Sequence, residues 1–146
     1  MRLLIQRVKN AHVNIEDTTY ASIGKGLLVF FAVHKDDVPQ TSLYLAKKLI
    51  NLRIFSDEQN KMNLSLKDTK QELLIVSQFT LYSNCSKGRR PDFIDTAPPA
   101  IALKSYQDFI SHVENEFGPV QTGKFGANMQ VGLVNDGPAT FFIEKL

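Results

Sequence analysis

Several features are scarce in this sequence of 146 residues, and each scarcity excludes a class of protein. The single cysteine cannot form an internal disulfide bond, and no cysteine–histidine cluster has the spacing of a structural zinc site. The formal net charge is only +2, so any nucleic-acid contact must come from a local patch. No apolar run approaches the roughly 18–20 residues needed to cross a bilayer, and the start of the chain is too weakly apolar for a signal peptide. We therefore expect a cytoplasmic protein that makes no membrane contact.

Common catalytic motifs are missing as well. The sequence contains no Gly-x-Ser-x-Gly, no His-Glu-x-x-His and no Gly-Lys-Ser/Thr phosphate loop. His12, His34 and His112 are scattered over predicted strands and a helix, which is typical of surface or structural histidines. Cys85 lies in a polar segment without a clear general base, so we interpret it as an incidental free thiol. We expect neither a metal nor a cofactor.

The composition that remains is that of one soluble domain spanning residues 1–146. Hydrophobic residues make up 43% of the chain, and a chain of this length can bury about two thirds of its unfolded surface. Short apolar or alternating runs predict strands at 3–8, 12–16, 27–33, 72–79, 129–135 and 139–144. The run at 27–33 is continuously apolar and indicates a strand buried on both faces.

Two helices are predicted from apolar residues at helical spacing. The first follows possible caps at Asp36 and Asp37, with Pro39 in its first turn, and the second is stopped by Gly118. Their apolar faces comprise Leu45, Ala46, Leu49 and Leu52 in the first helix, and Tyr106, Phe109, Ile110, Val113 and Phe117 in the second. We predict a mixed α/β fold: a mainly antiparallel or mixed β-sheet, or an open barrel, with two main helices packed on it.

Three polar segments are candidates for function. Residues 77–82 (SQFTLY) end a hydrophobic strand and open into the longest irregular stretch, 83–99, where binding sites are often found. Thr80 is a candidate nucleophile there and the backbone N–H groups a candidate oxyanion hole, although hydroxyls that merely terminate a strand explain the same pattern. Residues 87–91 (KGRRP) hold three cations that suit phosphate, or form a solvated turn balanced by Asp92 and Asp95. Residues 135–138 (NDGP) suit a hairpin turn, although Pro138 removes a ladder donor.

Taken together, six segments resemble the D-aminoacyl-tRNA deacylase family over essentially the whole chain, in the family's order and length. They are residues 1–8 (MRLLIQRV), 61–65 (KMNLS), 77–82 (SQFTLY), 87–91 (KGRRP), 122–127 (TGKFGA) and 135–140 (NDGPAT). One departure is Ala139, where the family usually has valine, which removes two methyl groups beside Pro138.

The resemblance implies a homodimeric hydrolase that cleaves the ester between a D-amino acid and the terminal ribose of a tRNA. It implies a pocket lined by residues 77–82, with Ser77, Gln78, Phe79 and Thr80 as the candidate catalytic residues. Backbone groups and the tRNA's own 2′-hydroxyl replace a protein nucleophile there. Within it, we assign the oxyanion donors to the N–H groups of Phe79 and Thr80.

The resemblance also implies that Gly137 and Pro138 form a Gly-cisPro element that enters the pocket of the other subunit, so that the active site lies at the subunit interface. We place Met129 in the substrate site, and Arg7 either holds the Gly-Pro unit by a backbone carbonyl or only covers a strand. A main-chain wall rejects L-amino acids by a clash, which predicts broad tolerance of D side chains and cleavage of glycyl-tRNA.

The basic residues Lys87, Arg89 and Arg90 are predicted tRNA contacts. Two other functions remain open on the residues alone. One is an RNA-binding module without turnover that uses the same three cations. The other is a hydrolase of small esters that depends on Cys85 or Thr80.

Overall fold

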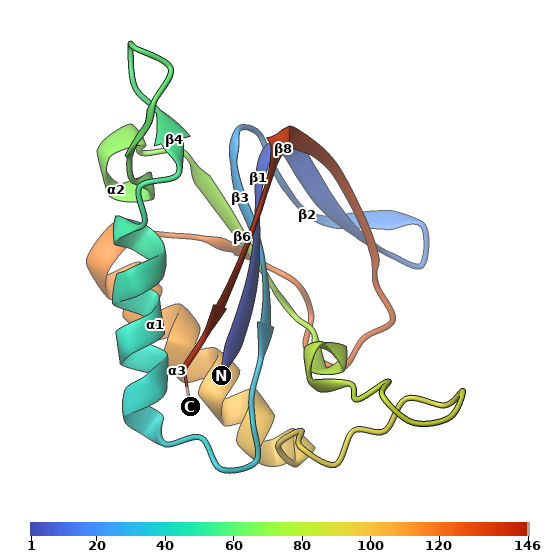
Figure 1. Cartoon of the computed structure of the whole chain (residues 1–146). Coiled ribbons are helices and arrows are strands. Elements are labelled where there is room, and N and C mark those ends of the chain that lie inside the picture. The colour runs from blue at the N-terminus through green and yellow to red at the C-terminus, as the bar shows by residue number, and fades with distance from the viewer. Residues whose placement is uncertain (146) are drawn as a thin grey trace.

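The fold is a strongly curved β-sheet with helices packed against one side (Figure 1). A computed structural model describes residues 1–145. The strands are β1 (Arg2–Ile15), β2 (Thr18–Ile23), β3 (Gly26–Ala32), β4 (Phe55–Ser56), β5 (Met62–Leu64), β6 (Glu72–Ser77), β7 (Gln121–Thr122) and β8 (Gln130–Glu144). The helices are α1 (Pro39–Asn51), α2 (Leu66–Thr69) and α3 (Pro99–Phe117), and η1 (Phe79–Tyr82) is a 3₁₀ turn. The predicted mixed α/β fold is confirmed.

The main sheet has the order β2-β1-β3-β6-β7, and β8 pairs with the free side of β1. The pairs β3–β6 and β6–β7 are parallel, whereas β1 is antiparallel to β2, β3 and β8. Contacts of β2 with β6 and β7 curl the sheet into a nearly closed barrel. As predicted, β3 is buried on both faces: Leu27, Val29 and Phe31 face the helices, while Leu28 faces the barrel interior.

One long strand, β1, replaces the two strands predicted at 3–8 and 12–16, so that prediction is wrong. Its first half pairs with β3 and its second half with β2, and the register against β8 shifts on both sides of Val8. The shifts turn the strand, so that Leu3 and Ile5 join the core under the helices while Val13 joins the barrel core. The strand β2 was not predicted.

A similar correction applies to the end of the chain. The predicted strands 129–135 and 139–144, with a turn between them, form the single strand β8, which pairs with β1 along its length. Gln6 pairs with Thr140 and Val8 pairs with Asn135, so residues 136–139 bulge out opposite Arg7. We call residues 136–139 the β8 bulge. A hairpin turn is therefore absent there, because the chain continues in the same direction beyond the bulge.

The two predicted helices are confirmed as α1 and α3. Pro39 is the first residue of α1, but the predicted caps are wrong, since Val38 occupies the N-cap position. The carboxylate of Asp37 instead accepts hydrogen bonds from the backbone N–H of His34 (2.7 Å) and from the amino group of Met1 (2.6 Å). In α3, Tyr106, Phe109 and Val113 are buried. The helix ends at Gly118, whose positive φ of 118° is a backbone conformation that favours glycine.

No helix or strand was predicted for the segment between α1 and β6. It contains the small antiparallel pair β4–β5, which lies outside the main sheet, and the short helix α2. Ser65 caps α2 by accepting a hydrogen bond from the N–H of Asp68, and the Asp68 carboxylate accepts one from the N–H of Ser65. In Figure 1 this segment lies beyond the carboxyl end of α1, at the opposite end of the molecule from η1.

Candidate active site

A mainly apolar cavity lies where the parallel strands β3 and β6 end. Its volume is about 310 Å³, and it is lined by Phe31, Ala32, Val33, Ser77, Phe79, Thr96, Ala97, Pro99, Ala102, Phe125 and Gly126. Carboxyl ends of parallel strands are a common place for ligand sites, because the connecting segments diverge there. Of the residues predicted for the pocket, Ser77 and Phe79 therefore line the cavity directly.

The chain makes a tight turn at the mouth of this cavity. The strand β6 ends at Ser77, the N–H of Gln78 still donates to the carbonyl of Phe31 (2.8 Å), and η1 follows at once. Within η1 the N–H of Leu81 returns to the carbonyl of Gln78 (3.2 Å). The N–H groups of Phe79 and Thr80 stand at the start of the turn and have no hydrogen-bond acceptor among residues 1–145. Two adjacent free donors beside an apolar cavity can stabilise an oxyanion.

An arginine that the sequence reasoning missed holds this turn in place. The Nη1 atom of Arg2 donates to the carbonyl of Leu81 (2.7 Å), its Nε atom donates to Glu144 (2.6 Å), and its guanidinium lies 4.1 Å from the ring centre of Tyr82. The Tyr82 hydroxyl is buried without a partner among the described residues, and burial raises its pKa. Arg2 therefore ties the last turn of η1 to both β1 and β8.

Aromatic rings form the outer wall of the cavity. Phe79 is 56% exposed and its ring lies 5.0 Å from that of Phe93, which comes from the long segment before α3. Phe125 and Gly126, from the segment 122–127, also line the cavity. Local patterns in the sequence could not predict this aromatic cluster, because its side chains come from three separate segments.

Arg7 makes the kind of contact expected of it. Its Nε atom donates to the carbonyl of Asp136 in the β8 bulge (2.9 Å), and its Nη1 atom donates to the carbonyl of Ile54 (2.7 Å). The side chain of Asn135 closes the bulge by accepting from the N–H of Ala139 (2.7 Å). Gly137 and Pro138 are exposed at its tip, joined by a cis peptide bond, and Ala139 is buried beneath them.

The β8 bulge does not reach the cavity of its own chain. Leu3 pairs with Phe31 at the cavity, whereas the bulge lies opposite Arg7, four positions along β1, or about 14 Å. Met129 is also separate from the cavity lining, since it packs on the barrel core beside Val131. One chain thus brings together Ser77 and Phe79 but leaves Gly137, Pro138 and Met129 elsewhere.

The basic segment predicted to contact tRNA projects from the body of the protein near η1 (Figure 1). Lys87, Arg89 and Arg90 are exposed, and within residues 1–145 none of them forms an ion pair. The two acids expected to balance them are engaged elsewhere. Asp92 pairs with Asn84 across the base of the loop (3.1 Å) and Asp95 pairs with Lys35 (2.9 Å), which lowers the pKa of the Asp95 carboxyl.

The described residues offer little else for catalysis. No group of three or more His, Cys, Asp or Glu side chains among residues 1–145 is placed to hold a metal ion. Cys85 is exposed, and its nearest polar partner is the hydroxyl of Ser83 at 3.9 Å. No helix in this part of the chain is long and apolar enough to cross a membrane.

Comparisons with known proteins show which family the chain resembles. Residues 4–144 match the model of the family described as D-Tyr-tRNA(Tyr) deacylase. The D-aminoacyl-tRNA deacylase of Thermosipho africanus is 57% identical over 99% of this chain and 97% of that protein, and the protein of the same name from Protochlamydia amoebophila is 51% identical over 100% and 97%.

Two solved structures share the fold. The c-Myc DNA unwinding element binding protein superimposes with a TM-score of 0.95, at 36% identity and over 100% of this chain and 99% of that one. A probable eukaryotic D-amino acid tRNA deacylase gives 0.86 at 19% identity, over 97% and 98% of the two chains, which bears on the fold alone. With a family match that spans nearly its whole length, this chain belongs to the D-Tyr-tRNA(Tyr) deacylase family.

Proposed function

We propose that this protein hydrolyses the ester between a D-amino acid and the terminal ribose of a tRNA, releasing free tRNA and the D-amino acid. The family match and the names of the relatives support this activity. The observation that carries it in this chain is the apolar cavity at the ends of β3 and β6, with the free N–H groups of Phe79 and Thr80 at its mouth.

An aminoacyl ester is already activated, so the reaction needs a positioned water and a stabilised oxyanion. Water adds to the carbonyl carbon, the carbon–oxygen bond to the ribose breaks, and a proton passes to the departing ribose oxygen. The N–H groups of Phe79 and Thr80 stabilise the charge on the carbonyl oxygen, and one such donor is typically worth about 2.7–4 kcal/mol. Ser77 and Gln78 position these donors, and the tRNA's 2′-hydroxyl assists. The side-chain hydroxyl of Thr80 takes no covalent part.

Selection of the D form requires a second wall that one chain does not supply. We place that wall in the β8 bulge of a second subunit, whose exposed Gly137 and Pro138 enter the cavity and leave no room for an L side chain. The position of these two residues supports this arrangement. They lie about 14 Å from the cavity of their own chain, so the cavity that they enter belongs to another subunit. Arg7 holds the bulge in position through the carbonyl of Asp136, and Met129 supports the barrel side of the site.

A filter that acts by a clash cannot exclude glycine, which has no side chain. We therefore propose that glycyl-tRNA is cleaved as well, and that D side chains of many kinds are accepted. The exposed Lys87, Arg89 and Arg90 contact the tRNA near its 3′ end. The protein works as a homodimer in the cytoplasm, without a cofactor.

The decisive experiment compares matched D- and L-tyrosyl-tRNA, with and without a chelator, and follows loss of the ester. Rapid cleavage of the D form alone, unaffected by the chelator, supports the proposal. Equal cleavage of both forms would contradict the rejection of L-amino acids by a steric clash. Binding of tRNA without turnover would instead favour an RNA-binding module. Replacement of Thr80 or Cys85 by Ala completes the test, because loss by about four orders of magnitude in either variant would make that side chain the nucleophile.

A further inference from the structure

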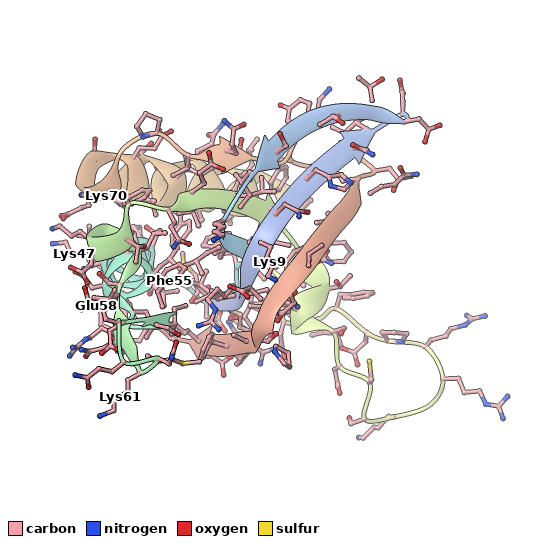
Figure 2. All side chains as sticks on the ribbon, turned by 90° about the horizontal axis from the view of Figure 1, so that it is seen from above. Lys9, Lys47, Phe55, Glu58, Lys61 and Lys70 are labelled. Atoms are coloured by element: carbon pink, nitrogen blue, oxygen red, sulfur yellow. The ribbon has the colours of Figure 1, made fainter. Side chains whose placement is uncertain are left out.

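A second concentration of positive charge lies at the end of the molecule opposite the cavity. Tyr44, Lys47, Lys48, Asn51, Leu52 and Arg53 line a shallow hollow of about 650 Å³ at the carboxyl end of α1, which we call the basic hollow. Lys47, Lys48 and Arg53 are exposed, and Lys145 lies 5.8 Å from the ring centre of Tyr44. Figure 2 shows Lys47, Lys61 and Lys70 on this same side of the molecule.

The acids nearby compensate this charge only in part. Asp57 accepts hydrogen bonds from the backbone N–H groups of Gln59 (2.9 Å) and Lys61 (3.0 Å), Asp68 caps α2, and both carboxylates face Arg53 more than the two lysines. Glu116 lies 3.9 Å from Lys47, which is a weak, solvent-screened pair, and Glu58 is the remaining exposed carboxylate of the β4–β5 turn. Exposed lysines and arginines that are not fully compensated can contact the phosphates of a nucleic-acid backbone.

The basic hollow is joined to the β8 bulge through a short chain of contacts. Arg7 binds the carbonyl of Asp136 in the bulge and the carbonyl of Ile54, the residue next to Arg53. Arg53 in turn donates to the backbone carbonyl of Asn63 (2.6 Å), within the KMNLS segment for which the sequence suggested no role. Hydrogen bonds from Arg7 therefore join the bulge to the residue beside the hollow.

We propose that the basic hollow binds the phosphate backbone of the acceptor stem of a tRNA whose aminoacyl end occupies the cavity of the partner subunit. The inference rests on the proposed function, in which the β8 bulge enters that cavity. A bulge inserted there brings the neighbouring hollow to the rim of the same cavity. The RNA is then held between the basic loop of one subunit, with Lys87, Arg89 and Arg90, and the basic hollow of the other.

The first test removes charge from the hollow without disturbing its packing. The double variant Lys47→Gln/Lys48→Gln is compared with Lys25→Gln/Lys104→Gln, which removes the same charge from two other exposed positions. Each variant and the wild type are assayed with two substrates. One is full D-tyrosyl-tRNA, and the other is D-tyrosyl-adenosine, which has the ester but no acceptor stem. We expect the preference for the full tRNA, as a ratio of kcat/KM values, to fall about tenfold in the hollow variant and to stay unchanged in the control.

Salt dependence gives a second readout of the same contacts. Each phosphate contact with duplex RNA or DNA contributes about 0.9 to the slope of log affinity against log salt, so two lost contacts reduce the slope by about 1.8. The advantage of the wild type over the hollow variant for tRNA should then shrink about twelvefold from about 50 to about 200 mM salt. Equal slopes in the two proteins would overturn the proposal.

Mixed dimers decide whether the contact is made across subunits. One subunit carries Lys47→Gln/Lys48→Gln, and the other carries Ala102→Trp, which fills the cavity, or Ala102→Phe if the larger side chain prevents folding. In the mixed dimer the open cavity faces the intact hollow of its partner, so we expect about half of the wild-type activity on tRNA. About half of the activity of the hollow variant itself would show that the hollow serves its own subunit, and would overturn the proposal.

The deacylase activity and the role of the basic hollow can be tested separately. If the wild type cleaves neither D-tyrosyl substrate, the proposed function is wrong. If it cleaves both and the hollow variant matches the control in its preference and its salt slope, the deacylase activity stands and the role of the basic hollow is wrong.

Discussion

Replacing Arg7 tests how the β8 bulge is held. Arg7 is only 13% exposed and donates two hydrogen bonds to carbonyl oxygens, those of Asp136 and Ile54. Hydrogen bonds from a charged donor are worth about 1.5–3 kcal/mol each, and the lower value applies because the bulge is partly exposed. The Asp136 carboxylate, 3.9 Å away and 43% exposed, adds little. We expect Arg7→Ala to lower the unfolding free energy by about 3 kcal/mol.

In a chain of this size each kcal/mol corresponds to about 2–4 °C in Tm, so Arg7→Ala should melt about 6–12 °C lower. Melting is followed by circular dichroism at one fixed protein concentration, because the proposed dimer would make Tm depend on concentration. Arg7→Lys is the matched control: an ammonium group reaches one carbonyl but not both, so about half of the loss should return.

The same variants report on substrate selection. In the proposed mechanism a bulge released from Arg7 excludes L-amino acids less well, so the ratio of D- to L-tyrosyl-tRNA cleavage should fall in Arg7→Ala and recover in part in Arg7→Lys. Arg53→Ala changes both reactions equally, since the two substrates share their RNA. An Arg7→Ala protein that melts within about 1 °C of the wild type, or that melts lower yet keeps its full D/L ratio, would refute the assigned role.

Three further contacts and the proposed dimer can each be tested. Arg2→Lys loses the hold on the carbonyl of Leu81 and should reduce kcat about ten- to a hundredfold with little change in KM; an unchanged kcat in steady-state assays would contradict it. Tyr106→Phe removes a buried hydrogen bond to the carbonyl of Ile75 (2.8 Å), which still accepts one from the N–H of Gly123. Urea titrations should show that the free energy of unfolding falls by about 1 kcal/mol, and activity assays should show no change. The hydroxyl and N–H of Ser65 lower the pKa of Asp68 from 3.8, so this stabilisation is complete at neutral pH and is lost as pH falls below about 4; Asp68→Asn should flatten the acid decline of stability. Dilution below the dimer dissociation constant should abolish activity while leaving the folded signal, as sedimentation and assay at matched concentrations can check.

The elements that sequence reasoning identified correctly are those whose whole pattern lies within one contiguous segment. The helix α3 shows its buried Tyr106, Phe109 and Val113 at helical spacing and has a glycine where it ends. The strand β3 is apolar throughout because both of its faces are covered. In each case the local pattern and the tertiary surroundings demand the same residues.

The failures concern irregular places within strands. Lys9 and Asn10 are exposed in the middle of β1 and resemble a break, although the strand continues past them with a shifted register. Asp136 and Gly137 suit a hairpin turn, yet the chain resumes pairing with β1 beyond them. A bulge and a turn use the same residue types, and only the partner strand decides between them. The helix α2 is too short for periodicity, and Ser65 with Asp68 was its one local sign.

The sequence by itself determined the fold class, the two long helices, the polar turn after β6 and the family, because these depend on patterns contained in contiguous segments. Tertiary structure alone decided that the cavity joins Ser77 and Phe79 to Phe125, that Arg2 and Arg7 anchor η1 and the β8 bulge, and that the bulge lies about 14 Å from its own chain's cavity. Those relations join residues up to about 130 positions apart in the chain, and the strand register that brings them together is a property of the whole sheet.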